Sequence, residues 1–574
     1  LNNETVASTR QISIINNGTI NINSSESVGI QLRPDAGGIL EYGSNSTTGI
    51  INVNGYRSYG MMTVPNNKIS GGGQFYKGTG TSSSLENVGT INVQGDEASA
   101  FSLQYKIRDP LNWKSTSIIN IGMSDPNQNG DGNIPGNNPN LVEGAMGLYS
   151  QVTNDYYIDG AGKKYGLGAL ANYGTINIGE YALNVAGVRS EGGTADSLAA
   201  VTNQSGNIKI TGKGNYGVVV NSEFATGSNG TDLHYGVAGQ PRKQGLIDIK
   251  AGKSVGILVL KGGKGANTGI INIDLGNYDS NLQNENSIGF YIVNGTGENL
   301  NRDTVVASQF QSRGQITTTG KNAHAVVVKR EVKNAAGTDY IDSTFTNNGL
   351  IQNNTAGTIG IYAENGASII HTGFSTSFGK SEIISGAGAI GIYAKGLKDS
   401  SDPAAAGDKT TVTVSGPITV GNSTGTNTSV GILAEGDTSE VTFNTGAKLS
   451  LGNDSIGILL KNTNIADSIK INALQYNMGN NSIFLYGEKS TLKISDSLTA
   501  LNGTAFSSLG TDSTMLYAAN NSHISIDSDI TLPLSGKPSL FTNLYVAENS
   551  DVTLENGNTL TMTPSQKTGL VSFS

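Results

Sequence analysis

NGTININSSESVGIQL, residues Asn17 to Leu32, is a two-part unit whose pattern returns along most of the chain. Gly18 opens a first half in which apolar and polar residues alternate, TINI, and Gly29 opens a second half with the same alternation, GIQL. Alternation with a period of two is typical of β-strands that have one buried face. The unit therefore predicts two short strands joined by a polar turn.

The distance between the two glycines is the most regular property of this repeat. It is 11 residues in the first unit and recurs six more times, with alanine twice in the second place. The further pairs are Gly49 and Gly60, Gly89 and Ala100, Gly206 and Gly217, Gly245 and Gly256, Gly314 and Ala325, and Gly349 and Gly360. A constant interval between changing residues indicates a geometric constraint. We expect glycine in both halves because the chain turns sharply there, and positive φ carries no steric penalty for glycine.

Stacking of the units explains the constraint, because a half-buried strand pair needs copies of itself above and below to bury its apolar face. The expected fold is all-β: a right-handed parallel β-helix, or β-solenoid, with loop excursions. One row of side chains should then point inward, and the residue before each of them should point outward. The inward row is Ile22, Val53, Val93, Ile178, Ile210, Ile249 and Ile273. A helical solenoid would instead show a period of 3.6 with Ala, Leu and Glu.

The domain organisation follows from the interruptions of the repeat. Residues 1–574 are expected to form one continuous β-helical rod, a fragment of a longer protein. Residues 104–171 are expected to be a large loop insertion, and they hold the only tryptophan. Residues 397–409 are expected to be a break between looser coils and tighter, three-stranded coils.

Composition and charge exclude several classes of protein. The chain has 78 glycines, only 14% charged residues and a net charge of −9, which argues against a nucleic-acid partner. It has no cysteine, so neither disulfides nor thiolate metal sites contribute. The longest apolar runs fall far short of the roughly 18 to 20 residues that a membrane-spanning helix needs.

The repeated motifs resemble those of a known family. Units of the form NxGTINI, followed by SxGIxL or SIGIYA, look like the passenger regions of type V autotransporters, and more narrowly the very large adhesins of fusobacteria. The resemblance is strongest over residues 17–396. It implies export, display on the outer surface of the bacterium, and membrane attachment through a C-terminal barrel that is absent from this chain. It implies no particular ligand or binding residue, because the recurring motif is structural.

An enzymatic activity is one alternative to the adhesin that this resemblance implies. Right-handed β-helices also include polysaccharide-cleaving enzymes, which need paired carboxylates, but only Asp248 and Asp274 lie on or beside neighbouring repeat strands. The four histidines, His234, His324, His371 and His523, share no spacing. The sequence Gly421–Gly425 matches G-x-S-x-G, yet a turn rather than a helix follows it, so no nucleophile elbow is expected. We therefore expect no enzymatic activity.

One loop has the spacing of a calcium site. Asp125, Asn127, Asn129 and Asp131 supply oxygen atoms at positions 1, 3, 5 and 7, and Gly130 stands at the sharp-turn position. The bidentate glutamate of position 12 is replaced by Gly136. A polar surface loop explains the same residues, so calcium is a possible cofactor only.

The candidate ligand-binding residues are the aromatic ones of the insertion, Trp113, Tyr156, Tyr157 and Tyr165, because sugars pack on aromatic rings and interface energy gathers on Trp and Tyr. The expected partner is a host-cell receptor protein, a glycan or another bacterium. The alternatives are a passive stalk that carries a distal binding head and, less favoured, a polysaccharide-cleaving enzyme.

Overall fold

The structure is a computed structural model, and the secondary structure it describes is entirely β-strand. The chain divides into two compact units, Leu1–Gly269 and Ile270–Ser574. Residues 11–573 are described apart from these stretches: 33–39, 64–83, 105–116, 128–131, 135–136, 152–155, 159–163, 167–169, 193–198, 231–244, 276–285, 300, 303–311, 321–322, 331–341, 374, 377–378, 397–408, 437–438, 464–468, 472–473, 496–509, 511, 528–529, 533–541, 548, 555–559 and 563–570.

Unit Leu1–Gly269 consists of stacked parallel strands that form three sheets, which we number by their place in the repeat. The first sheet is β2 (Thr19–Ile22), β5 (Ile50–Val53), β8 (Thr90–Val93), β10 (Ile118–Ile121), β16 (Thr175–Ile178), β20 (Asn207–Ile210) and β23 (Leu246–Ile249). The second sheet is β3 (Val28–Leu32), β6 (Tyr59–Thr63), β9 (Ser99–Leu103), β12 (Met146–Ser150), β18 (Ala186–Ser190), β21 (Tyr216–Asn221) and β24 (Val255–Leu260).

The third-sheet position of this unit is filled by two groups of strands. They are β1 (Gln11–Asn16), β4 (Leu40–Asn45) and β7 (Ser84–Asn87), and then β15 (Leu170–Ala171), β19 (Ala199–Asn203), β22 (Ala225–Asn229) and β25 (Lys264–Asn267). Two short pairs are added to the stack, β11 (Val142–Glu143) with β17 (Ala182–Leu183), and β13 (Tyr156–Ile158) with β14 (Lys164–Gly166).

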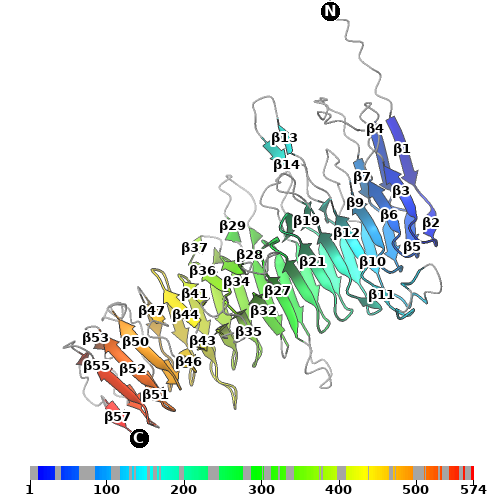
Figure 1. Cartoon of the computed structure of the whole chain (residues 1–574). Coiled ribbons are helices and arrows are strands. Elements are labelled where there is room, and N and C mark those ends of the chain that lie inside the picture. The colour runs from blue at the N-terminus through cyan, green and yellow to red at the C-terminus, as the bar shows by residue number, and fades with distance from the viewer. Residues whose placement is uncertain are drawn as a thin grey trace, which may run out of the picture. The chain divides into compact units, whose positions relative to one another are not determined.

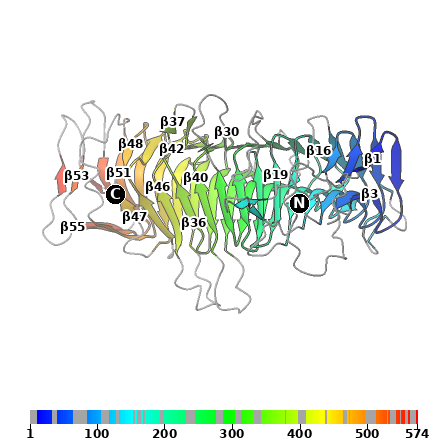
Figure 2. The same cartoon turned by 90° about the horizontal axis from the view of Figure 1, so that it is seen from above.

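Unit Ile270–Ser574 repeats the arrangement, as Figures 1 and 2 show for strands stacked side by side. Its first sheet is β26 (Ile270–Asp274), β31 (Gln315–Thr319), β34 (Leu350–Asn353), β39 (Glu382–Ser385), β42 (Pro417–Val420), β45 (Lys448–Leu451) and β48 (Gln475–Asn477). Its second sheet is β27 (Ser287–Val293), β32 (Ala323–Lys329), β35 (Ile359–Glu364), β40 (Ile390–Lys395), β43 (Val430–Glu435), β46 (Ile456–Lys461), β49 (Ile483–Glu488), β51 (Thr514–Ala519), β54 (Thr542–Val546) and β57 (Val571–Phe573).

The third-sheet strands of this unit are β28 (Thr296–Asn299), β33 (Thr344–Asn347), β36 (Ser368–His371), β41 (Thr410–Val414), β44 (Ser439–Phe443) and β47 (Ile469–Ile471), and then β50 (Thr491–Ser495), β52 (His523–Asp527) and β55 (Asp551–Leu554). Short additional pairs are β29 (Asn301–Arg302) with β30 (Ser312–Arg313), β37 (Ser375–Thr376) with β38 (Gly379–Lys380), and β53 (Ile530–Leu532) with β56 (Leu560–Met562).

The parallel β-helix predicted from the repeat is therefore confirmed, and so is its register. In unit Leu1–Gly269 the inward row runs Ile22, Val53, Val93, Ile121, Ile178, Ile210, Ile249, and each of these side chains is buried. Ile273, in the other unit, is buried in the same way. Ile121 is the member that sequence reasoning missed, because it lies inside the segment 104–171 that the sequence predicts as an insertion.

The reason expected for the repeated glycines is wrong. None of the recurring pairs of glycines has positive φ. Instead, a Cβ on Gly217 would lie 2.6 Å from the carbonyl oxygen of Gly256 on the next coil and 3.0 Å from a methyl group of Ile247. The constraint is thus the close approach of neighbouring coils, since a contact under 3.0 Å forces one of the two to shift.

A ladder of asparagines, most of them buried, lies at the ends of many third-sheet strands. Asn203 lies within the stack, where its Nδ2 donates to Oδ1 of Asn229 at 2.8 Å and to the carbonyl of Leu246 at 3.1 Å, and its Oδ1 accepts from Asn172 at 2.8 Å. These side chains are almost completely buried. The same ladder joins Asn16, Asn45 and Asn87, then Asn172, Asn203, Asn229 and Asn267, and, in the other unit, Asn299 and Asn347.

His371 takes the asparagine position on the coil after Asn347. It is fully buried, with Nε2 3.0 Å from the carbonyl oxygen of Pro417 and Nδ1 3.2 Å from Nδ2 of Asn347. A carbonyl only accepts, so Nε2 carries the proton and Nδ1 accepts from the Asn347 amide. Burial lowers the pKa of His371 to about 4. The ring therefore continues the ladder in its neutral form.

Because of this histidine, we expect the free energy of unfolding to decrease as the pH is lowered. Its pKa is about 4 when folded and about 6.5 when unfolded, so the unfolded chain binds the extra proton as the pH falls from about 6.5 to about 4, at a cost of about 3 kcal/mol. His371→Asn restores the usual ladder residue and should remove this part of the pH dependence. The measurement is the urea midpoint of both proteins near pH 7 and near pH 4.5. An equal drop in both would show that His371 is not responsible.

Candidate functional site

The turn between first-sheet and second-sheet strands is where the described chain departs most from the repeat. After β8 the turn is short, and Glu97 takes a left-handed conformation with φ of 50°, as Arg57 does one coil earlier. After β10 the turn is replaced by residues 122–145, which we call the expanded turn. It includes the short strand β11 and the exposed side chain of Met123.

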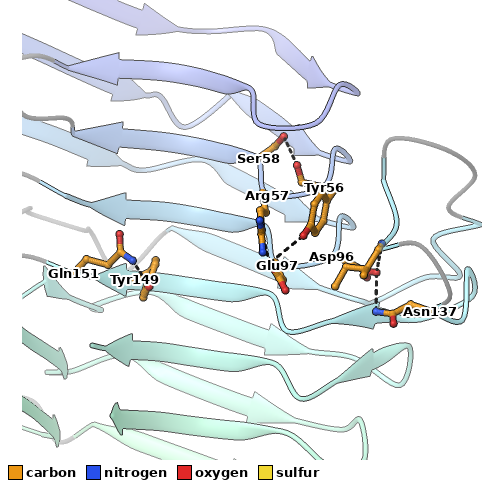
Figure 3. A network of polar contacts seen from close by, with 9 residues as sticks. Tyr56, Arg57, Ser58, Asp96, Glu97, Asn137, Tyr149 and Gln151 are labelled. Atoms are coloured by element: carbon orange, nitrogen blue, oxygen red, sulfur yellow. Dashed lines mark hydrogen bonds and ion pairs between the residues drawn. The ribbon is translucent and has the colours of Figure 1, made fainter. Parts of the chain in front are cut away.

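Asp96 fastens the expanded turn to the stack (Figure 3). Its side chain is fully buried. Oδ2 accepts hydrogen bonds from the backbone N–H of Ile134 at 3.0 Å and from Nδ2 of Asn137 at 3.3 Å, and Oδ1 accepts from the backbone N–H of Glu143 at 2.8 Å. The backbone N–H of Asp96 also donates to the carbonyl of Gly132 at 3.1 Å. One buried carboxylate therefore holds three points of the expanded turn through charge-assisted hydrogen bonds.

The electrostatics of the turn depend on this carboxylate. Glu143 is half-buried and adjacent to it, and the pKa of Glu143 is raised, first by burial and then by the negative charge of Asp96. The backbone N–H of Glu97 donates to the Glu143 carbonyl at 2.8 Å. Two acidic side chains therefore lie close together here, and a backbone hydrogen bond joins the expanded turn to the coil.

A second polar cluster lies on the turns beside Asp96. Arg57 Nε is 2.5 Å from Oε2 of Glu97, and the Arg57 guanidinium lies 4.9 Å from the ring centre of Tyr56 (Figure 3). The Arg57 and Glu97 side chains are 51% and 37% exposed, so the pair contributes little to stability. Tyr and Arg are nevertheless the side chains on which interface energy tends to gather.

Asp96 and the Tyr56–Arg57 pair were not found by sequence reasoning. The available signal was the position of Asp96: it stands in the last regular turn, QGDEA, before the repeat is interrupted. A carboxylate at that position can accept hydrogen bonds from several loop N–H groups. In an ordinary turn such groups would donate to water.

The structure describes only part of the predicted aromatic site. Trp113 lies outside the described residues. Tyr156, Tyr157 and Tyr165 lie on β13 and β14, which pair antiparallel with Tyr157 opposite Tyr165. The backbone therefore places two of the predicted tyrosines side by side in one hairpin, and their side chains lie outside the described part.

Residues 104–171 are not one uninterrupted insertion. They contain β10, which pairs with β8 and β16 in the first sheet, and β12, which pairs with β9 and β18 in the second. The stack therefore continues through this segment. Among the described residues of this segment, the departures from the repeat are the expanded turn and the strand pair β13–β14.

The structure describes the predicted calcium loop only in part, with residues 128–131 and 135–136 outside the described residues. The backbone N–H of Asn127 donates to Oδ1 of Asp125 at 3.0 Å, and Asn127 has φ of 42°, so the two residues form a tight turn closed by a side chain. Asn129 and Asp131 lie outside the described residues. Across the described ranges, no three His, Asp or Glu side chains gather in a way that could hold a metal ion.

Comparisons with known proteins give no family for this chain. No protein-family model matches the sequence, and a search of curated proteins gives no match. Among the described residues there is also no helix of the length and apolarity that crossing a membrane requires.

The role of Asp96 can be tested by its removal. Asp96→Ala leaves three donors of the expanded turn without their acceptor, so the amides of Ile134 and Glu143 should lose their protection from hydrogen exchange. We expect a global cost of only about 2 kcal/mol, because the freed turn can be solvated. Glu97→Gln is the matched control: it changes the neighbouring, exposed carboxylate and should alter neither quantity by much. Unchanged protection in Asp96→Ala would show that other contacts hold the turn.

Proposed function

We propose that this chain is a non-enzymatic binding protein: the displayed part of a bacterial surface adhesin, in which a β-helix carries the expanded turn and the hairpin β13–β14 to a glycan or a receptor protein on another cell. The fold supports the proposal, because stacked coils present short polar strands that are already fully ordered and offer few anchors. Elaborated turns supply the additional surface that binding requires.

The observation that carries the proposal is the attachment of the expanded turn by Asp96. A buried carboxylate is costly unless its hydrogen bonds are made, and three donors to Asp96 among the described residues belong to the expanded turn. The described loop residues that are fixed in this manner, 132–134 and 137–145, keep their shape before a partner arrives, which lowers the entropy cost of binding. A passive stalk has no use for a preformed loop.

The surface of the expanded turn has the composition of a recognition site. Met123 is 46% exposed, and Asp125, two residues further along, provides an exposed polar group. Apolar anchors with polar neighbours are typical of sites for proteins and glycans.

The experiment exchanges the expanded turn for a regular one. In the full chain, residues 122–145 are replaced by the turn Gln94–Ala98 of the preceding coil, so that β10 and β12 remain joined and stacked. Binding to a glycan array, to a panel of human cell-surface receptors and to whole cells is then compared with that of the unaltered chain.

We expect the exchange to leave the far-ultraviolet circular dichroism nearly unchanged and to abolish binding. A second variant, in which a short Gly-Ser linker replaces residues 152–169, tests the hairpin in the same way. If both variants bind as well as the unaltered chain, the site lies elsewhere. If the unaltered chain binds nothing while it is folded, the stalk becomes the better hypothesis.

A further inference from the structure

The outer face of the second sheet in unit Ile270–Ser574 carries two regular rows of side chains over six successive strands, β32, β35, β40, β43, β46 and β49, most of which can be followed in Figure 1. The apolar row is Val327, Tyr362, Tyr393, Leu433, Leu459 and Tyr486. The charged row, two residues further along each strand, is Lys329, Glu364, Lys395, Glu435, Lys461 and Glu488.

Both rows lie on the outside of the coils. The residue between them on each strand points inward, as Ala363 and Ala394 show by their complete burial, whereas Tyr362, Tyr393 and the six charged side chains are half-buried. Val327, at the end of the apolar row, is the exception in that row and is buried. The rows are also ordered. Tyr362 and Tyr393 pack edge to face with ring centres 5.1 Å apart, and Lys329 Nζ lies 3.4 Å from Oε2 of Glu364. The face is therefore preformed.

The charged row alternates in sign along its whole length, and it starts with a lysine and ends with a glutamate. When the charged row is placed against the same row in the reverse order, every position meets the opposite charge. Over the same six strands the apolar row has the matching property: in the reverse order, each tyrosine meets an aliphatic residue. Beyond these strands the apolar row continues with Tyr291 on β27 and Tyr517 on β51, where the charged row has ended. Over the six strands, each row is thus complementary to the same row in the reverse order. This property suggests that the partner is a second copy of the same face.

Geometry restricts how such a copy can dock. A rotation that turns one face toward another reverses either the direction of stacking or the direction of the strands. If the rotation reverses the direction of the strands, the apolar and charged rows exchange places. The two rows of one copy then cannot both face the same rows of the other copy. Only reversal of the stacking direction, about a two-fold axis parallel to the strands, superposes both rows at once. A two-fold axis is also the commonest symmetry of protein dimers.

We propose that this chain forms a lateral, antiparallel homodimer through the outer face of β32–β49, with the two-fold axis passing between β40 and β43. Lys395 of one copy then faces Glu435 of the other, Glu364 faces Lys461, and Lys329 faces Glu488. In the apolar row Tyr393 faces Leu433, Tyr362 faces Leu459, and Tyr486 faces Val327.

The size of the face sets the expected affinity. Six strands stacked about 4.8 Å apart, each about 20 Å long, give roughly 500 Å² per copy and about 1,000 Å² in total. This area is at the low end of specific interfaces. The dimer should therefore be weak and reversible, and visible as a concentration-dependent equilibrium.

The first test is sedimentation velocity of the full chain over a range of concentrations. We expect a monomer–dimer equilibrium that Lys395→Glu weakens at least tenfold, because it sets two carboxylates opposite each other at both symmetry-related places near the axis. Lys448→Glu is the matched control, since it makes the same charge change on an exposed lysine of β45, in the first sheet, and should leave the equilibrium unaltered.

The double variant Lys395→Glu with Glu435→Lys separates docking from folding. Between two antiparallel copies it restores unlike charges, whereas within one chain it places like charges on neighbouring strands at positions 364 and 395, and again at 435 and 461. Recovery of dimerisation to within about threefold of the original supports the proposal. A folded double variant that stays as weak as Lys395→Glu overturns it, and so does an unaltered chain that sediments as a monomer at every concentration.

Disulfide trapping tests the orientation independently, because the chain has no cysteine of its own. Lys329→Cys and Glu488→Cys are prepared as separate proteins. In the antiparallel dimer the two positions face each other, so a mixture should give covalent dimers on oxidation, and each protein alone should not. Covalent dimers in the separate samples but none specific to the mixture would overturn the antiparallel arrangement.

Discussion

Replacing Ile249 by asparagine should lower the free energy of unfolding by about 3–5 kcal/mol, the largest effect we expect from a single substitution. Ile249 is fully buried on β23 and lies in register with Ile210, which is equally buried on the neighbouring strand. The substitution removes most of a buried aliphatic side chain, which costs about 2–5 kcal/mol when truncated to a small residue. It also buries an amide for which the aliphatic row offers no hydrogen-bond partner.

The neighbouring position provides the control. Asp248→Asn places the same amide one residue earlier, where the side chain is half-buried on the outward face and can reach water. It should change stability by less than about 1 kcal/mol. Urea unfolding followed by circular dichroism measures both variants. Similar losses in the two would mean that the alternation does not separate an inside from an outside.

Why the sequence predicted the fold so well can be seen at these two residues. The alternation of Ile and polar residues identifies the buried face of each strand. The interval of 11 residues within each unit marks equivalent positions in successive units, so the register between coils follows from the two together. Ile210 and Ile249 are neighbours in the structure because of that register. Local pattern and stacking depend on the same residues, which is the favourable case for sequence reasoning.

Other features could not be predicted from the sequence, because the residues that interact to form them lie on different coils. The third sheet in the first half of the chain was not predicted, since strands such as SLEN and ATGSN hardly alternate. Their common element is the terminal asparagine, whose hydrogen-bond partners lie on the coils before and after it. Asp96 escaped for a similar reason, because its partners are backbone N–H groups about 40 residues further along, in a segment without a repeat.

The terminal asparagines lead to the second large effect. Asn203→Ala should cost about 4 kcal/mol of unfolding free energy, although asparagine is an ordinary surface residue in most proteins. In the ladder its side chain is fully buried and takes part in three hydrogen bonds. Alanine removes this donor from Oδ1 of Asn229, within the stack, and from the part-buried carbonyl of Leu246, and each buried hydrogen bond lost in this way costs about 1–3 kcal/mol.

A second asparagine ladder on the same coils serves as the comparison. Asn21, Asn52, Asn92, Asn120 and Asn177 are joined on the outward face of the first sheet by amide hydrogen bonds of 2.7–2.9 Å. Their lengths match those of the inner ladder, yet these side chains are exposed or half-buried. Water can replace a lost partner there, so Asn92→Ala should cost less than about 1 kcal/mol.

The pair of variants thus separates hydrogen-bond geometry from burial. If geometry decided the energy, Asn203→Ala and Asn92→Ala would be equally harmful, because each interrupts a ladder of similar distances. If burial decides it, unfolding in urea will show a difference of about 3 kcal/mol. Asn203→Asp sharpens the test, since a carboxylate in the inner ladder can accept from Asn172 but cannot donate to Asn229 or Leu246. It should be at least as harmful as alanine near pH 7 and should recover part of the loss at low pH, where the protonated acid regains a donor.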